Sequence, residues 1–261
     1  MVRPKKHLGQ HFLTDQNIAR KIVGLISSSN ATVIEIGAGT GVLTKFLIED
    51  QLEKLHIIEI DEESVDYLHA NFPELASKIS LEDFLKSDLS VFQAPITIIG
   101  NFPYNISSQI FFQVLNYKHE VNEVVCMIQK EVAERLASGP GNKTYGILSV
   151  LLQAWYEISY CFTVGENVFN PPPKVKSAVI KLKRNSITDL GCKPDLFQQI
   201  VKQAFNQRRK TLRNGLRNRL HTDIIEHEIF NKRAEQLHVK DFVFITQLIE
   251  NQITSTDSKL Y

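Results

Sequence analysis

The chain has 261 residues, of which 43% are hydrophobic and 23% charged, and its net charge is +1. These values are ordinary for a soluble globular protein with one large domain or a large and a small one. No apolar run is long enough to cross a bilayer, and none follows the basic N-terminus, which argues against a membrane protein and a cleaved signal peptide. The three cysteines are far apart without a C-x-x-C pair, which argues against a disulfide framework or a zinc site and predicts a cytoplasmic protein.

Short β-branched runs alternate with helical patterns through the first two thirds of the chain. Strands are predicted over residues 33–36, 55–60, 79–81, 96–99 and 123–128, and helices over 42–53, 62–70 and 107–115. This alternation predicts an α/β fold in which helices cover both faces of a parallel sheet.

The pattern changes near the middle of the chain. Residues 156–164 and 176–183 both have strand character, but the segment between them is too short for a helical crossover and contains three consecutive prolines. These strands are therefore predicted to pair antiparallel, so that a mostly parallel sheet contains one reversed strand. After a predicted linker over 185–194, apolar residues recur at helical spacing. The predicted division is a domain of residues 1–185 followed by a small helical domain of residues 186–261.

Three glycines, Gly37, Gly39 and Gly41, lie between a predicted strand and a predicted helix. Glycines there let a ligand approach the backbone closely, although a tight turn alone would also use them. Glu59 ends the next strand, where a carboxylate either stays solvated or accepts hydrogen bonds from ribose hydroxyls. In this order, the features favour a ligand with a ribose and a carboxylate but no pyrophosphate. S-adenosylmethionine fits that description better than NAD does.

A second motif, Asn101-Phe102-Pro103-Tyr104, follows the predicted strand 96–99. It therefore lies at the carboxyl end of the parallel sheet, where ligands bind in such folds. One interpretation is an ordinary Asn-x-Pro turn. The other is a catalytic loop, because the motif resembles the [DNS]-P-P-[YF] signature of methyltransferases that act on amino groups.

Longer segments carry a more specific resemblance. In order, they are GQHFL (9–13), EIGAGTG (35–41), GNFPYNIS (100–107), QKEV (129–132), FNPPPKVxSAV (169–179) and FNQRRKTLR (205–213). With them the chain resembles, over nearly its whole length, the ribosomal RNA adenine N6,N6-dimethyltransferase family, which acts on small-subunit RNA. The resemblance implies a Rossmann-like S-adenosylmethionine-dependent methyltransferase fold. It also implies dimethylation of adjacent adenosines near the 3′ end of small-subunit rRNA during ribosome biogenesis.

The resemblance implies catalytic roles for Asn101, Pro103, Tyr104 and Phe169. The N6 amino group of adenine is a poor nucleophile because its lone pair is delocalised into the ring. Hydrogen bonds from this group to the Asn101 side-chain oxygen and the Pro103 carbonyl would localise the lone pair. Tyr104 and Phe169 would stack on the two faces of a flipped-out base. Because the sulfonium already makes the methyl group electrophilic, the protein mainly supplies position, and no strong general base is needed.

The same resemblance implies a set of cofactor contacts. Gln10, His11 and Leu13 would lie over the cofactor, Gly37 with the neighbouring Gly39 by its methionine part, Glu59 on the ribose, Asp83 on its adenine and Asn101 between cofactor and target. The sequence departs from the commonest pattern at His11, Ala38 and Phe102. It also lacks the usual glycine before Asp83, so Asp88 stays an alternative for the adenine contact. No metal site is predicted.

Basic residues concentrate between Arg208 and Arg219, in a segment without an acid. Such a run is often only a solvated helix face. Here it lies in the predicted helical domain and suits RNA phosphates, so RNA binding is predicted for Arg208, Arg209, Lys210 and Arg213. The predicted partner is small-subunit rRNA within a ribosomal subunit or its precursor, bound by a monomer without membrane contact.

Alternatives for the function stay open. One is a large-subunit rRNA adenine N6-methyltransferase of the macrolide-resistance type, against which the FNPPPKV segment and the GPG loop over 139–141 argue. Another is a non-catalytic RNA-binding assembly or transcription factor on the same fold, against which the intact glycine and Asn101 motifs argue. Methylation of DNA adenine or of protein glutamine is a third, and the basic helical region makes protein the weakest substrate.

Overall fold

A computed structural model of the chain describes residues 2–27, 30–222 and 224–257. The backbone divides into two compact units. The first consists of Met1–Ala133 with Glu157–Arg184, and the second of Glu134–Tyr156 with Asn185–Tyr261. This partition differs from the predicted division at residue 185 because residues 134–156 belong to the second unit.

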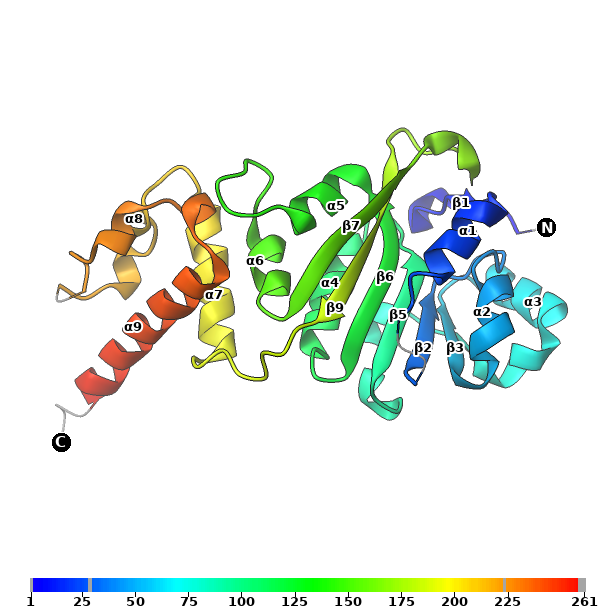
Figure 1. Ribbon diagram of the computed structural model, residues 1–261, viewed down its shortest axis with the longest axis horizontal. Coiled ribbons are helices and arrows are strands. Elements are labelled where there is room, and N and C mark those ends of the chain that lie inside the picture. The colour runs from blue at the N-terminus through cyan, green and yellow to red at the C-terminus, as the bar shows by residue number, and fades with distance from the viewer. Residues whose placement is uncertain (1, 28–29, 223, 258–261) are drawn as a thin grey trace. The chain divides into compact units, whose positions relative to one another are not determined.

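The first unit is built on a seven-stranded sheet (Figure 1). In spatial order the strands are β4 (Ile79–Leu81), β3 (Leu55–Glu59), β2 (Thr32–Ile36), β5 (Ile96–Asn101), β6 (Val121–Gln129), β9 (Ser177–Arg184) and β7 (Tyr156–Val164). The neighbouring pairs from β4 to β6 are parallel, and β9 is antiparallel to β6, with Cys126 opposite Ile180. The prediction of a mostly parallel Rossmann-like sheet with one reversed strand is confirmed.

Helices of the first unit cover both faces of this sheet, which is why the central strands are mostly apolar. They are α1 (Gln16–Val23), α2 (Thr44–Gln51), α3 (Glu62–Asn71) and α4 (Ser107–Asn116), while α5 (Lys130–Ala137) carries the chain into the second unit. Figure 1 shows α1 and α2 in front of the sheet and α4 behind it. None of the helices in the described part of the chain is long and apolar enough to cross a membrane.

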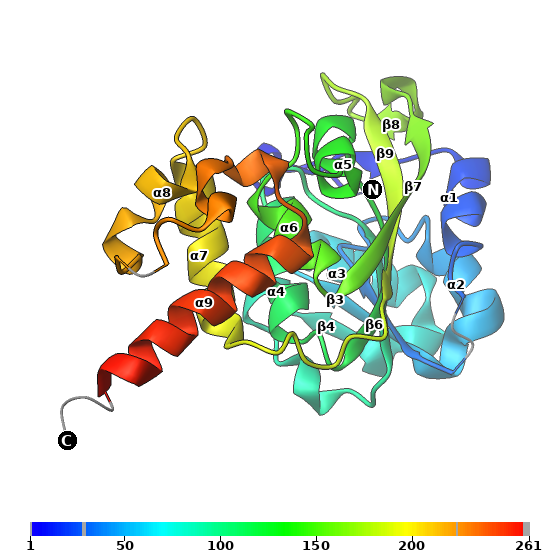
Figure 2. The same cartoon turned by 60° about the vertical axis from the view of Figure 1, so that its left-hand side comes forward.

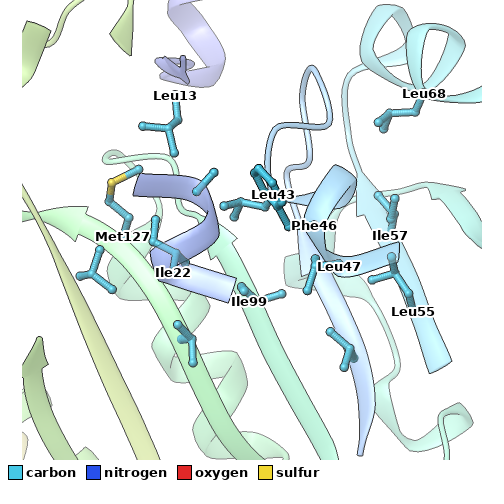
Figure 3. Close-up of a cluster of buried hydrophobic side chains, with 14 of the residues drawn as sticks. Leu13, Ile22, Leu43, Phe46, Leu47, Leu55, Ile57, Leu68, Ile99 and Met127 are labelled. Carbon is cyan, nitrogen blue, oxygen red and sulfur yellow. The ribbon is translucent and has the colours of Figure 1, made fainter. Parts of the chain in front are cut away.

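The main core of the first unit lies between the sheet and the helices α1 and α2 (Figure 3). Ile22 of α1 and Leu47 of α2 are fully buried there, together with Ile57 of β3, Ile99 of β5 and Met127 of β6. Burying such a side chain stabilises the fold by roughly 2 kcal/mol. The core therefore fixes the strands whose carboxyl ends carry the glycine motif, Glu59 and Asn101.

A second, two-stranded sheet joins distant parts of the first unit. β1 (Phe12–Leu13) pairs antiparallel with β8 (Phe169–Asn170), with Leu13 opposite Phe169. The Thr14 backbone N–H also donates to the Val168 carbonyl oxygen at 2.8 Å. Two of the sequence motifs, GQHFL and FNPPPKV, are thus held side by side, a pairing too short to show a strand pattern in the sequence.

The second unit is helical. Its longer helices are α6 (Ile147–Gln153), α7 (Pro194–Asn206) and α9 (Val239–Asp257), with the short α8 (Leu212–Gly215) after α7. Figure 2 shows α6, α7 and α9 lying against one another. Phe205 joins them, since its ring stacks on Phe242 of α9 and meets the edge of the Tyr145 ring, with centroids 5.9 and 6.0 Å apart. This packing explains why residues 134–156 belong here.

Candidate active site

A pocket of the first unit opens at the carboxyl ends of β2, β3 and β5. It is lined by Leu8, Gly9, Gln10, His11, Phe12, Ile36, Gly37, Gly39, Ile58, Glu59, Ile60, Glu82, Asp83, Phe84, Asn101, Phe102, Pro103, Tyr104 and Ile106. The two motifs read from the sequence as a nucleoside site and a catalytic loop therefore meet in one cavity. Parallel strands end at the same edge of a sheet, which is the physical reason for this convergence.

The glycine loop of the pocket has the backbone that only glycine adopts readily. Gly37, Gly39 and Gly41 have φ of +66°, +56° and +75°. A Cβ on Gly39 would lie 2.6 Å from Cε1 of Phe12, whereas a Cβ on Gly37 would meet no heavy atom within 4 Å. Gly39 therefore allows close packing of the protein itself, and Gly37 leaves open space at the pocket wall.

Glu59 is buried beside this loop. Its Oε2 accepts a hydrogen bond from the Gly39 backbone N–H at 3.0 Å, and its Oε1 accepts one from the Asp61 N–H at 2.9 Å. Burial raises the pKa of the Glu59 carboxyl, and the two backbone hydrogen bonds oppose that effect. The carboxylate is thus fixed in place, with lone pairs remaining on both oxygens for a ligand's paired hydroxyls.

Glu35 is a further acid at the site that the sequence reasoning did not single out. It lies in the buried strand β2, and its Oε2 accepts a hydrogen bond from Thr44 Oγ1 at 2.6 Å. Burial raises its pKa to about 8, helped by the nearby charge of Glu59. It borders a smaller cavity together with Gly37, Leu13 and Asn101. An acid in the middle of an apolar strand was the signal in the sequence.

The motif 101–104 forms another part of the pocket wall. Asn101 is the last residue of β5, and its Nδ2 donates to the His11 carbonyl oxygen at 2.7 Å. Because a carbonyl oxygen can only accept a hydrogen bond, the contact fixes the orientation of the Asn101 amide. Nδ2 faces His11, and Oδ1 is available as an acceptor. The Pro103 carbonyl oxygen accepts the Ile106 N–H at 3.2 Å and keeps a second lone pair. Both predicted acceptors for an amino group are therefore held by the fold.

Tyr104 lies beside His11 at the rim. Their rings are stacked with centroids 5.5 Å apart and planes at 27°, and the Tyr104 hydroxyl hydrogen-bonds Ser177 Oγ. Burial raises the pKa of this tyrosine. His11 is itself anchored, because its Nδ1 is 2.8 Å from the Pro171 carbonyl oxygen. One face of Tyr104 is thus occupied by His11.

Phe169 and Leu13 do not line the main pocket. They are 4% and 3% exposed, face each other across the β1–β8 pair and belong to the hydrophobic core. Leu13 instead borders the smaller cavity next to Glu35. The structure brings the other predicted cofactor and catalytic residues to the main pocket.

The two candidate acids for the adenine contact lie in different surroundings. Asp83 lines the pocket and caps a short helical turn through a 3.0 Å hydrogen bond from the Leu85 N–H. Asp88 accepts hydrogen bonds from Ser90 and from the Tyr117 hydroxyl, and these contacts hold its pKa below the usual value. Because Asp88 does not line the pocket, Asp83 is the better candidate for the adenine contact. Ile60, 51% exposed at the same wall, was not predicted.

The basic segment of the second unit is partly neutralised within that unit. Arg208 Nε lies 3.3 Å from Glu235 Oε2, and Arg213 pairs with Glu226 at 3.3 Å. Although the sequence run contains no acid, acids from other parts of the unit therefore lie beside it on the folded surface. Arg209 and Lys210 are exposed. In the described residues, no group of three histidine, cysteine, aspartate or glutamate side chains is arranged to hold a metal ion.

Comparisons with known proteins agree on one family. A family model described as ribosomal RNA adenine dimethylase matches residues 1–251. The ribosomal RNA small subunit methyltransferase A of Parabacteroides distasonis is 55% identical over 257 residues, covering 97% of this chain and 96% of the relative. The protein of the same name from Cytophaga hutchinsonii is 52% identical over 255 residues, covering 96% and 99%.

Two solved structures share the fold. A dimethyladenosine transferase from Plasmodium falciparum has a TM-score of 0.80 at 24% identity, covering 92% of this chain and 98% of that one. The 23S rRNA methyltransferase ErmE has a TM-score of 0.68 at 20% identity, covering 92% and 99%.

Proposed function

The chain belongs to the ribosomal RNA adenine dimethylase family, and we propose that it transfers methyl groups from S-adenosylmethionine to the N6 amino groups of adenosines in small-subunit rRNA. The observation that carries this function is the convergence of the glycine loop, Glu59 and Asn101 on one pocket. The finer form of the proposal is dimethylation of adjacent adenosines near the 3′ end of that RNA. The setting is a cytoplasmic ribosomal subunit or its precursor, with the enzyme acting as a monomer.

The residues of the pocket fit S-adenosylmethionine. Open space beside Gly37 admits the methionine part, and the fixed Glu59 carboxylate accepts hydrogen bonds from the ribose hydroxyls. Asp83 supplies an acceptor for the adenine amino group at the far end of the pocket. Gln10 and His11 form part of the pocket wall and would contact the bound cofactor. When bound, the cofactor supplies an electrophilic methyl group.

The chain's own contribution is to orient the target amino group. Asn101 Oδ1 and the Pro103 carbonyl oxygen accept the two N–H bonds of the adenine N6, which localises its lone pair on the nitrogen. The free face of Tyr104 stacks on the flipped-out base. The methylated nitrogen then loses its proton readily, so no strong base is required at this position.

Phe169 is proposed as the second wall of the base site. In the structure it is buried in the core beneath the β1–β8 pair. Its contact with a base therefore requires the segment 168–173 to shift when RNA binds. Leu13, its partner across the pair, would shift with it and is proposed to approach the cofactor in the same movement.

The exposed part of the basic segment is proposed to bind RNA phosphates. Arg209 and Lys210 are the exposed members of this set, whereas Arg208 and Arg213 are paired with glutamates. Phosphate contacts of this kind bind RNA without reading its sequence and weaken with salt. Arg208 and Arg213 contribute mainly by shaping the surface, and can contact phosphates only if their glutamate partners release them.

One assay tests the substrate. Purified small and large ribosomal subunits that lack the modification are incubated with the protein and methyl-labelled cofactor, and the labelled RNA is mapped by mass. We expect N6-dimethyladenosine near the 3′ end of the small-subunit RNA. Methylation confined to the large subunit would replace this proposal with the macrolide-resistance activity. A protein that binds neither S-adenosylmethionine alone nor the cofactor with RNA would be a non-catalytic factor.

A further inference from the structure

Residues 5–11, here called the cover segment, contact the catalytic loop, and the last four of them, Leu8, Gly9, Gln10 and His11, line the pocket. The His11 carbonyl oxygen accepts the hydrogen bond from Asn101 Nδ2, and the His11 ring stacks on Tyr104. A Cβ on Gly9 would lie 2.6 Å from Asn105 Oδ1, so the backbone of the segment itself packs against the loop. The position of the cover segment therefore sets the position of Asn101.

The other end of the cover segment is held by Asp61, which follows Glu59 by two residues. Lys5 Nζ donates to Asp61 Oδ1, and Gln10 Nε2 donates to Asp61 Oδ2 at 3.1 Å. The Lys5 backbone N–H donates in turn to Gln10 Oε1 at 2.8 Å. Asp61 is only 2% exposed, so these contacts bind a buried carboxylate to the segment.

The same aspartate also fixes the ribose side of the pocket. Its backbone N–H donates to Glu59 Oε1. Its side chain caps α3 by accepting from the Glu63 N–H, and it also accepts from Ser64 Oγ at 2.9 Å. Burial disfavours the ionised form of Asp61, but hydrogen bonds from Lys5, Gln10 and Ser64 hold its pKa below the usual value. One buried carboxylate thus links Glu59, the cover segment and, through it, Asn101.

We propose that Lys5 and Asp61 are positioning residues for the cofactor site, an inference that rests on the proposed function. Their ion pair holds the cover segment closed over the place of the ribose and brings Gln10 and His11 to the cofactor. Without it, a smaller fraction of molecules has the closed pocket. The apparent dissociation constant rises in inverse proportion to that fraction. Cofactor release also becomes faster, because the segment has to move aside for the product to leave.

The test compares Lys5→Met with Lys6→Met, an identical change at the exposed neighbouring lysine. Binding of S-adenosylmethionine and of S-adenosylhomocysteine is measured by calorimetry without RNA, and dissociation by stopped-flow fluorescence. For Lys5→Met we expect about tenfold weaker binding and a rise in the cofactor KM that exceeds any fall in kcat. Lys5→Arg restores the affinity, and Lys6→Met leaves it unchanged. Lys5→Met is expected to melt a few degrees below the other two variants, because it leaves the buried Asp61 carboxylate without its cation, and all three variants stay folded at the assay temperature.

Asp61→Asn provides a second measurement. Asparagine can still cap α3 through its one side-chain oxygen, but it removes the charge that Lys5 neutralises. It also places an NH2 group at the position of Oδ2, which cannot accept from Gln10 or Ser64. We expect it to weaken cofactor binding as Lys5→Met does, and the double variant to bind no more weakly than the single ones. Equal binding by Lys5→Met and Lys6→Met, or additive effects in the double variant, would refute the positioning role and leave the proposed function standing. If the unaltered protein binds no S-adenosylmethionine, the proposed function itself falls.

Discussion

Glu35 is expected to lower the free energy of unfolding as pH rises. Most acidic side chains in folded proteins have the opposite effect, because their pKa values are lowered by folding. The pKa of Glu35 is raised to about 8 in the folded protein by burial, against an ordinary value of 4.5. Between these values the folded chain keeps the proton on Glu35 and the unfolded chain releases it. The unfolded state then binds fewer protons, so the free energy of unfolding falls as pH rises. The loss is about 1.4 kcal/mol per pH unit, and about 5 kcal/mol over the whole interval.

The perturbation that isolates this effect is Glu35→Gln. Glutamine has nearly the same shape, accepts the hydrogen bond from Thr44 and does not titrate. The difference in unfolding free energy, variant minus unaltered protein, should therefore rise by about 1.4 kcal/mol per unit between pH 5 and pH 8. Urea unfolding of both proteins at four pH values measures it, and groups common to both cancel. Glu74→Gln, the same change at an exposed position, should show a far smaller dependence. A flat difference for Glu35→Gln would refute the reasoning.

Three further predictions concern the loop, the basic surface and the glycine turn. Asn101→Ala should lower kcat by about 100-fold or more, a larger effect than its effect on cofactor affinity, because it removes an aligned acceptor for the target amino group; near-normal turnover in a single-turnover assay would contradict the mechanism. Joint reversal of Arg209 and Lys210 to glutamate should weaken RNA binding and lower the slope of log affinity against log salt by about 1 per side chain, with cofactor binding unchanged; equal loss of both affinities would count against it. Gly39→Ala should destabilise the fold by at least about 1–2 kcal/mol in urea unfolding, because its φ is +56° and the added Cβ would lie 2.6 Å from Cε1 of Phe12. Gly139→Ala, with open space around it, should not destabilise the fold; equal effects of the two changes would contradict this prediction.

The sheet could be predicted from the sequence because its buried strands are short runs of mostly apolar residues. Residues of β2, β3 and β5 are buried on both faces, so these strands are mostly apolar in the sequence, with few polar residues between the apolar ones. The short β1–β8 pair was not predicted, since two residues in each strand give no periodicity. The sequence also did not show that residues 134–156 belong to the second unit. That assignment depends on the contact between the Tyr145 and Phe205 rings, which are 60 residues apart in the sequence.

The basic segment shows a different limit of sequence reasoning. Between Arg208 and Arg219 no acid occurs, which predicted an uncompensated positive surface. The acids that neutralise it, Glu226 and Glu235, follow later in the chain and reach Arg213 and Arg208 through the fold. Charge patterning along a sequence describes neighbours in the chain, whereas a folded surface is composed of neighbours in space. We therefore expect phosphate contacts mainly from the exposed members of the run, Arg209 and Lys210.

Residues of the pocket can be predicted from the sequence only where the fold fixes the number of residues between them. Gly39 and Glu59 are joined by a direct hydrogen bond across adjacent parallel strands, so the distance between them in the sequence is set by one strand–helix–strand unit. Asp61 has no such constraint on its partners. Lys5 and Gln10 reach it from a segment without regular structure, and many spacings would allow the same contact. The link from Glu59 through Asp61 to Asn101 therefore emerges only from coordinates, although every residue in it lies within or beside a motif that the sequence displays.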